Sequence, residues 1–278
     1  MNKLLTLVGL MVLLAACSQK EEKITRLWQL EGRSLMVLTG TAADIAARKN
    51  FPAAEIMDVY STTDAAYNVK LGKADAFIFD EVVLKNIVRK YPASLTIVEE
   101  PVAKAEIAVA FNKERTVLME RVNSSLEKLR KNGILAQMKQ KWIHSNYKAV
   151  PELPKLNEGG DIDTVWVKNG YYYQLSSTEG RQTESALKVG ICAQFEPMMF
   201  VYKNQFTGFD MELALRLGKM LGKKIEVVDM SFDSLILSLQ SGKVDFAISN
   251  FEITPQRKEF VNFSDPYLEQ DISALVRR

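Results

Sequence analysis

The chain has 278 residues, of which 47% are hydrophobic and 25% charged, and its formal net charge at pH 7 is +2. A nearly neutral chain of ordinary composition argues against a polyelectrolyte partner such as DNA. The length suits one large domain or two lobes. The two cysteines are Cys17 and Cys192, so no intramolecular disulfide is available if Cys17 is acylated.

The first sixteen residues are typical of a secretory signal. One charge, at Lys3, precedes an apolar run from Leu4 to Leu14 and then small residues. This run is too short and wrongly flanked for a stable spanning helix, and no later apolar stretch would span a bilayer. Leu14-Ala15-Ala16-Cys17 resembles a bacterial lipobox, although an ordinary signal with a chance cysteine is the alternative. We expect cleavage after residue 16, a lipid on Cys17 and a tether over 17–26, which places the protein at a bacterial membrane, facing the periplasm or the exterior.

Two segments share one pattern. Gly72–Ile78 and Gly242–Ile248 both read Gly-Lys-apolar-Asp, then two apolar residues and Ile. Each follows a stretch with helical spacing of apolar residues, 62–71 and 232–241, and glycine suits a helix end. The apolar run after each Asp is typical of a buried parallel strand.

Further strands are expected before each of these units. They lie at 35–38 and 55–60 in the first part of the chain, and at 187–191 and 224–228 in the second. The alternation of strands and helices predicts an α/β fold with two lobes, each a parallel sheet covered by helices. Between them, 148–186 reads as a linker. Its β-prone runs around Asn169-Gly170 predict a hairpin, in which the tyrosines are interpreted as cross-strand packing.

Polar and aromatic side chains follow several of the predicted strands. Ligands of parallel sheets bind beyond the carboxyl ends of the strands, where helix N-termini converge. These positions suit a small polar or zwitterionic molecule, although some of them equally suit helix caps. No cofactor, metal-ligand cluster or nucleophile–base pattern is found, and the only histidine, His144, is interpreted as a surface residue. The residues at the strand ends are Thr41, Asp80, Phe195, Ser249 and Asn250.

Residues 187–278 closely resemble the first lobe of the solute-binding proteins of bacterial amino-acid ABC transporters, which have the type II periplasmic-binding fold. The resemblance rests on five segments, at 189–197, 208–214, 232–236, 249–257 and 263–267. Residues 27–147 resemble the rest of that family: a second lobe over 27–104, then a return strand and helices over 105–147 that join the first lobe.

The order of the two parts is reversed relative to the family. The sequence resembles a circular permutation with its new termini at the hinge, where 148–186 bridges the old termini and 187–278 is the first lobe ending in a hinge strand. The expected hinge pairs strands 106–111 and 271–277. A tandem array of broken binders, or a dimer with swapped lobes, is left open.

The resemblance also implies site residues. Arg257 matches the arginine that pairs with the ligand α-carboxylate, Asp80 matches the acid that receives the α-ammonium group, and Thr41 matches a hydroxyl that helps to hold the carboxylate. The three further matches are a residue that hydrogen-bonds the ligand backbone and two aromatic walls of the cleft, namely Ser249, Phe195 and Phe232.

Two residues depart from the family pattern. Glu252 stands where Ser or Thr commonly helps to bind the carboxylate, and its charge would repel a carboxylate unless it is protonated or turned away. Glu252 therefore either meets a cationic group or marks a ligand that is not a standard α-amino acid. Cys192 stands where many members have an Asp that contacts a basic group, which argues against lysine- or arginine-like ligands.

The function that the resemblance implies is capture of an amino acid or similar solute by lobe closure, for delivery to an ABC permease. The protein is not expected to be an enzyme. Two alternatives are a dehydratase of the cyclohexadienyl type, for which Glu252 or Glu81 would be the candidate acid or base, and a ligand-sensing module.

Overall fold

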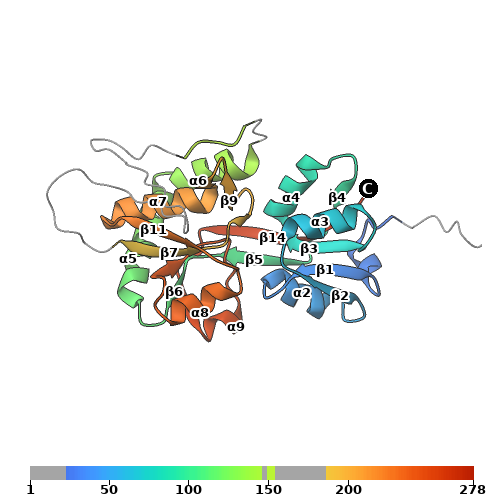
Figure 1. The fold of residues 1–278 in the computed structure, drawn as a ribbon, viewed down its shortest axis with the longest axis horizontal. Helices are drawn as coiled ribbons and strands as arrows, with labels where there is room; N and C mark the ends of the chain where they lie inside the picture. Colours follow the sequence, from blue (N-terminus) through green and yellow to red (C-terminus); the bar gives the residue numbers. More distant parts are fainter. Residues whose placement is uncertain (1–22, 146–148, 154–185) are drawn as a thin grey trace, which may run out of the picture.

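The computed structural model describes residues 23–145, 149–153 and 186–278. These residues form two α/β lobes, side by side, which are joined by two crossing strands (Figure 1). Cys17, the signal segment and the predicted hairpin around Asn169-Gly170 lie outside the described residues.

The second lobe, formed by the N-terminal part of the chain, is built on a sheet with the strand order β2-β1-β3-β14-β4. Its three parallel strands are β1 (Ser34–Leu38), β2 (Glu55–Val59) and β3 (Ala76–Asp80). Every residue of β3 is buried, as expected of a parallel strand with helices on both sides. The remaining elements are the turn η2 (Leu27–Leu30), α2 (Ala42–Asn50), α3 (Thr62–Lys70), α4 (Glu81–Lys90) and β4 (Leu95–Ile97).

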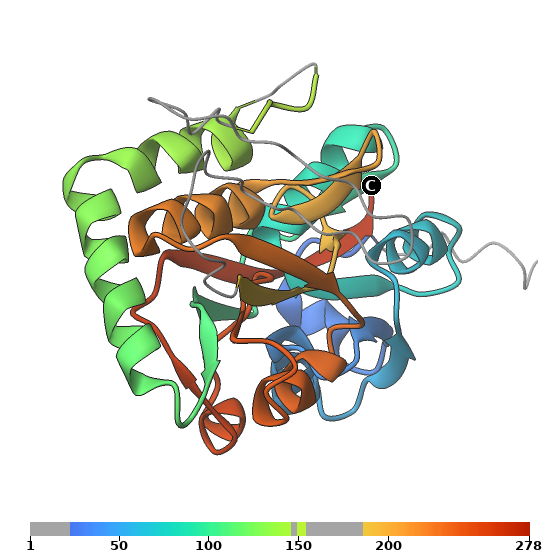
Figure 2. The same cartoon turned by 60° about the vertical axis from the view of Figure 1, so that its left-hand side comes forward.

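The first lobe has an equivalent sheet with the order β11-β7-β12-β6-β13. Its strands are β6 (Ala110–Asn112), β7 (Leu187–Ile191), β11 (Ile225–Asp229), β12 (Phe246–Ala247) and β13 (Val261–Phe263). A small separate sheet contains β8 (Gln194–Phe195), β9 (Met199–Tyr202) and β10 (Gln205–Thr207). The helical elements, seen around the sheet in Figure 2, are α5 (Thr116–Lys131), α6 (Ile134–Lys139), η3 (Gln140–His144), α7 (Phe209–Leu221), α8 (Ser234–Gln240) and α9 (Pro255–Lys258).

The predicted repeat is confirmed down to its hydrogen bonds. The Asp75 carboxylate accepts a bond from the Ser34 amide at 3.0 Å, and the Asp245 carboxylate accepts one from the Lys188 amide at 2.8 Å. In each lobe the aspartate therefore links the start of one parallel strand, β1 or β7, to the turn that precedes the neighbouring parallel strand, β3 or β12. The repeated glycine has a left-handed φ, +74° at Gly72 and +69° at position 242, which explains why glycine stands there.

The crossing strands β5 (Ala103–Ile107) and β14 (Leu268–Arg277) pair antiparallel, from Leu268 opposite Ile107 to Ile272 opposite Ala103. The sequence placed the paired hinge at 106–111 and 271–277, which is wrong by several residues. Residues 272–276 pair with β3, and 275–277 with β4, in the second lobe, while β6 pairs with β12 and β13 in the first. Each crossing segment thus becomes the antiparallel strand of the sheet that it enters.

Both halves of the chain are consequently needed to complete either sheet.

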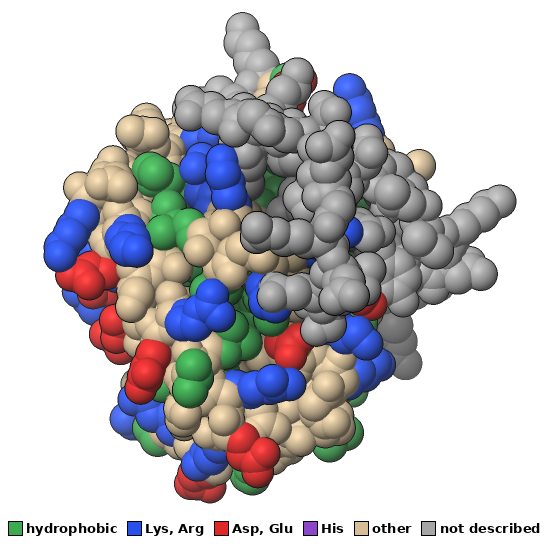
Figure 3. All heavy atoms as spheres, turned by 90° about the vertical axis from the view of Figure 1, so that its left-hand side faces the viewer, with side chains coloured by type: hydrophobic (Ala, Val, Ile, Leu, Met, Phe, Trp, Pro, Cys, Tyr) green, Lys and Arg blue, Asp and Glu red, His purple; other side chains and the backbone are tan. Residues whose placement is uncertain are grey.

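On the first-lobe face shown in Figure 3, basic and acidic side chains are interspersed wherever the described residues are visible. Within the described part of the chain, no helix is long and apolar enough to cross a membrane.

Candidate functional site

The carboxyl ends of the parallel strands in the two lobes bring three polar side chains together. Asp80 ends β3 in the second lobe, Asn250 follows β12 in the first lobe, and Gln270 lies on the crossing strand β14. The Asn250 side-chain amide donates a hydrogen bond to Asp80 Oδ2, and Gln270 Nε2 donates to Asn250 Oδ1 at 3.1 Å. All three side chains are buried. Asp80 and Asn250 were predicted site residues, whereas Gln270 was not.

Two acceptor atoms of this network have no partner in the described part of the chain. The direction of its hydrogen bonds follows from Asp80: a carboxylate only accepts, so Asn250 turns its Nδ2 group towards Asp80, and Asn250 Oδ1 in turn accepts from the Gln270 amide. Asp80 Oδ1 and Gln270 Oε1 are buried and have no hydrogen-bond partner among the described residues. Buried acceptors without partners cost free energy, so they mark a place where a hydrogen-bond donor would be bound favourably.

The electrostatic surroundings of Asp80 are unusual. Burial raises its pKa well above the ordinary value, and the nearby charge of Glu252 raises it further. Arg257, Asn250 and Gln270 act in the opposite direction and lower the pKa. A cation placed beside Asp80 would favour its ionised form.

Arg257 is buried at the start of the short helix α9, where Thr254 caps the helix by accepting from the Arg257 amide at 3.2 Å. Its Nη1 donates to the Glu252 backbone oxygen at 2.8 Å and to Glu252 Oε2 at 2.6 Å. Its Nη2 donates to the Gly40 oxygen of the other lobe at 2.7 Å. The predicted carboxylate-binding arginine therefore lies between the lobes and bonds to protein oxygens.

Glu252 is neither remote from the site nor turned away from it. Its side chain is 1% exposed and forms a buried ion pair with Arg257. The sequence analysis treated Glu252 as a departure that would repel a ligand carboxylate, and the structure adds that Glu252 offers Arg257 a carboxylate from within the chain.

Aromatic rings line the same region. The ring of Phe232 lies 5.5 Å from that of Phe195 and 5.2 Å from that of Phe251, centroid to centroid. Phe195 also contacts Phe79 of the other lobe at 5.6 Å. The Arg257 guanidinium lies over the rings of Phe251 and Phe232, at 4.6 and 5.0 Å, which adds cation–π attraction. Phe195 and Phe232 were predicted as walls, whereas Phe79 and Phe251 were not.

Two predicted hydroxyls hold the backbone next to the site. Thr41 caps α2, because its Oγ1 accepts from the Asp44 amide at 3.2 Å and donates to the Leu38 oxygen at 2.7 Å. Ser249 Oγ accepts from the Cys192 amide at 2.9 Å and donates to its carbonyl oxygen at 3.0 Å. Contact of either hydroxyl with a ligand stays a prediction.

A third buried acid supports the site from behind. Asp210, on α7, accepts from the Asn250 amide at 2.6 Å and from the Tyr267 hydroxyl at 2.8 Å. Burial raises the pKa of Asp210 to about 7, although both hydrogen bonds lower it. Asn250 has a φ of +49°, and the bond to Asp210 holds its backbone in that left-handed conformation. Asp210 lies in the segment 208–214 that carries the family resemblance, but no role in the site was predicted for it.

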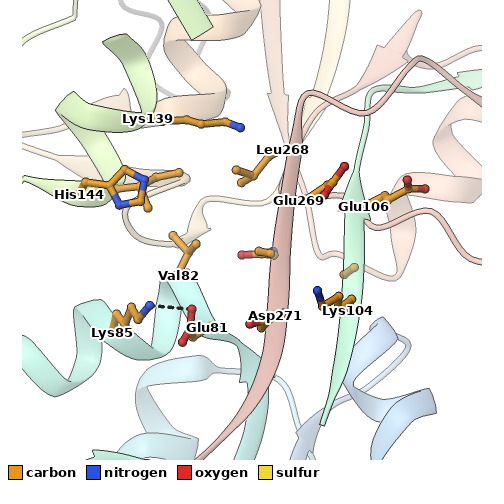
Figure 4. A pocket seen from close by; sticks show the side chains of 13 residues that line it. Glu81, Val82, Lys85, Lys104, Glu106, Lys139, His144, Leu268, Glu269 and Asp271 are labelled. Carbon is orange, nitrogen blue, oxygen red and sulfur yellow. Dashed lines mark hydrogen bonds and ion pairs between the residues drawn. The ribbon is translucent and has the colours of Figure 1, made fainter. Parts of the chain in front are cut away.

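A cavity of about 560 Å³ lies beside the crossing strands, lined by side chains from α4, β5, β14, α6 and η3 (Figure 4). Gln270 belongs to its wall, and so do His144 and Glu81, which forms an ion pair with Lys85 at 2.7 Å. His144 is exposed, in agreement with its interpretation as a surface residue. Among the described residues, no group of three or more His, Cys, Asp or Glu side chains could hold a metal ion.

Further bonds join the lobes around the site. Thr62 Oγ1 donates to the Gln194 oxygen at 3.2 Å, and Lys90 Nζ pairs with the Glu196 carboxylate at 2.5 Å. Together with the bond from Arg257 to Gly40, these contacts hold the two lobes against each other.

Comparison with known proteins identifies the C-terminal part of the chain. Residues 187–278 match the family of bacterial extracellular solute-binding proteins, family 3. The arginine-binding extracellular protein ArtP of Bacillus subtilis is 42% identical over 93 residues, which are 33% of this chain and 36% of ArtP. The ABC transporter arginine-binding protein 1 of Escherichia coli is 33% identical over 104 residues, 37% of this chain and 43% of that protein. The probable histidine-binding protein of Campylobacter jejuni is 38% identical over 99 residues, 34% and 39% of the two chains.

Among solved structures, the arginine-bound domain 1 of TmArgBP is 43% identical, covering 34% of this chain and 80% of that one, with a TM-score of 0.30. The chain spans less than half the length of each of the three curated relatives. All three are named as binding proteins, in agreement with the prediction that this chain is not an enzyme. These comparisons therefore show that residues 187–278 are similar to the bacterial extracellular solute-binding proteins of family 3.

Proposed function

We propose that this protein captures a small polar solute, an amino acid or a similar compound, between its two lobes and delivers it to an ABC permease. One observation carries the proposal: Asp80 and Arg257, from different lobes, converge on one buried polar site in which Asp80 Oδ1 lacks a partner. A solute with a donor group would satisfy that acceptor. Because both lobes contribute, such a solute would favour the closed arrangement over the open one.

The class of solute is supported by the relatives, which are named as binding arginine or histidine. The aromatic wall of Phe195 and Phe232 would pack against the apolar part of such a molecule. Cys192 brings no charge to the site, because burial first, and then the nearby Asp229, raise the pKa of its thiol to about 12.

Isothermal titration of the purified protein with a panel of amino acids and related amines tests the proposal. We expect one solute per chain to bind the parent protein. Asp80→Ala should weaken that binding at least tenfold. The matched control is Asp64→Ala, which changes an exposed acid in the first turn of α3. If no solute of the panel releases heat or raises the melting temperature, the proposal is wrong.

We further propose that the chain is a permuted binder in which one chain supplies both lobes. The support is that each sheet takes one antiparallel strand, β6 or β14, from the other part of the chain, so that one chain contains both lobes. A rearranged gene in which 187–278 precedes 23–147 should give a monomer with the same solute affinity. A dimer by sedimentation, with lobes exchanged between chains, would contradict it.

The predicted lipid anchor belongs to the same proposal, because it would keep the binder close to its permease. Cys17→Ser should release the protein from the bacterial membrane fraction into the soluble fraction, and should remove the acyl mass from the mature N-terminus. An unmodified Cys17 in the mature protein would exclude the anchor.

A further inference from the structure

The charge balance of the site bears on which solute it accepts. Two acids, Asp80 and Glu252, and one cation, Arg257, are buried within the same polar cluster, and a third acid, Asp210, is buried behind it. Glu252 and Arg257 neutralise each other in an ion pair of 2.6 Å. Both oxygens of Asp210 accept hydrogen bonds, so Asp80 is the acid of this group that keeps a buried oxygen unpartnered among the described residues.

The free hydrogen-bonding groups of the site also favour a cationic donor over a carboxylate. A bound molecule meets two unpartnered acceptors, Asp80 Oδ1 and Gln270 Oε1. Arg257, in contrast, already uses three of its five N–H donors, two of Nη1 on Glu252 and one of Nη2 on Gly40. Arg257 thus already binds a carboxylate of the protein, whereas the free acceptors beside Asp80 would be satisfied by hydrogen-bond donors of the solute.

A carboxylate on the solute would face two difficulties. It would have to share with Glu252 a guanidinium that already uses three of its five donors, and it would enter a region that already holds three buried acids. An ammonium group meets neither difficulty, because two of its three donors match the two unpartnered acceptors.

We propose that the site selects a small organic amine without a free α-carboxylate, with its ammonium group bound between Asp80 and Gln270 while Glu252 takes the place of the missing carboxylate on Arg257. This inference rests on the proposed function and narrows its solute. It makes Glu252 the residue that determines specificity.

Space for the rest of such a molecule adjoins the site. Gln270 is part of the wall of the cavity of about 560 Å³, a size within the usual range of small-molecule sites. The cavity wall holds three lysines and four carboxylates, so its acidic groups outnumber its lysines. The four are Glu81, Glu106, Glu269 and Asp271.

Matched pairs of compounds that differ only in the carboxylate test this assignment. Isothermal titration at pH 7.5 compares agmatine with arginine, histamine with histidine and tyramine with tyrosine. For at least one pair we expect the amine to bind tenfold or more tightly than its amino acid. Glu252→Thr frees Arg257 and should reverse that preference. Glu259→Gln, at an exposed position next to α9, should leave it unchanged.

The outcomes separate the two proposals. If, in every pair that binds, the parent protein binds the amino acid as tightly as its amine or more so, the amine assignment is wrong and the solute-binding function stands. If no compound of any pair binds, the amine assignment is wrong, and the full panel decides whether the solute-binding function is wrong too. If Glu252→Thr unfolds, as judged by its melting curve, Glu252→Gln takes its place, and an unreversed preference in the folded variant removes Glu252 from the assignment.

Discussion

Removing the carboxylate of Glu212 should destabilise the first lobe without touching the binding site. Glu212 lies on α7 and is 1% exposed. It accepts from Lys141 Nζ at 2.8 Å, from Trp142 Nε1 at 2.8 Å, and from Arg216 Nε and Nη2 at 3.0 and 2.6 Å. Lys141 and Trp142 belong to η3, so this one carboxylate ties the N-terminal part of the chain to the segment that begins at residue 187.

The magnitude follows from the exposure of the partners. Trp142 is fully buried, so in Glu212→Ala its N–H would lose its partner at a cost of about 1–3 kcal/mol. Lys141 and Arg216 keep 31% and 22% side-chain exposure and would turn partly towards water. We therefore expect a loss of about 2–4 kcal/mol, at or below the range for breaking a fully buried ion pair. That loss corresponds to a melting temperature lower by roughly 5–15 °C.

Thermal and urea unfolding, followed by circular dichroism, measure this loss. Glu127→Ala is the matched control, because its ion pair with Lys131 is 58% and 72% exposed, and solvent screening should leave the stability nearly unchanged. Burial raises the pKa of Glu212, but the bonds from Lys141, Trp142 and Arg216 lower it further than burial raises it. The difference between parent and Glu212→Ala should therefore shrink as the pH falls below the ordinary glutamate range. Equal stability of the two variants at pH 7 would refute this reasoning.

Three further predictions concern other buried groups. Asp80→Asn should raise the free energy of unfolding at pH 8 by on the order of 1 kcal/mol, because the raised pKa of Asp80 makes its ionised form costly in the folded state. This gain in stability should vanish towards pH 4, where Asp80 is protonated in the folded state and approaches its ordinary pKa in the unfolded state. A gain that does not change with pH would contradict the prediction. Gly208→Ala should prevent stable folding, because a Cβ there would lie 2.8 Å from the Pro197 oxygen at a φ of +119°, whereas Gly133→Ala, with open space, should cost about 1 kcal/mol in urea unfolding. In a Cys17→Ser background, the buried thiol of Cys192, with its pKa raised to about 12, should react with a thiol reagent at pH 8 only after unfolding, and rapid native labelling would contradict its burial.

Local patterns in the sequence predicted most of the secondary structure. The glycine–lysine–aspartate repeat fixed the end of a helix and the start of a buried strand in each half, because glycine at positive φ and a short apolar run act over a few residues. The limits of α3 and β7 accordingly agree with their predictions to within a residue. The hinge was misplaced because β14 is one uninterrupted strand of ten residues, and nothing local marks the point at which its partner changes from β5 to β3.

Some residues of the site could likewise be predicted from local sequence, whereas others depend on the packing of the two lobes. The sequence determined which residue types stand at the ends of the parallel strands, and so Asp80, Asn250 and Phe195 were found from position alone. Gln270 was missed because its role depends on β14 passing between the lobes beside Asn250, which lies 20 residues away in the chain. Phe79 was missed because a buried strand residue gives no sign of the ring that it will meet in the other lobe.

For Glu252, the sequence determined only that a negative charge replaces a hydroxyl in a carboxylate-binding segment. The tertiary structure decided what that charge does: the turn into α9 brings Arg257 onto it, and the approach of Gly40 from the other lobe fixes the guanidinium in place. The physical reason is that the free energy of a buried charge depends on which partners surround it. Those partners come from segments 217 residues apart, which only the packed lobes bring together.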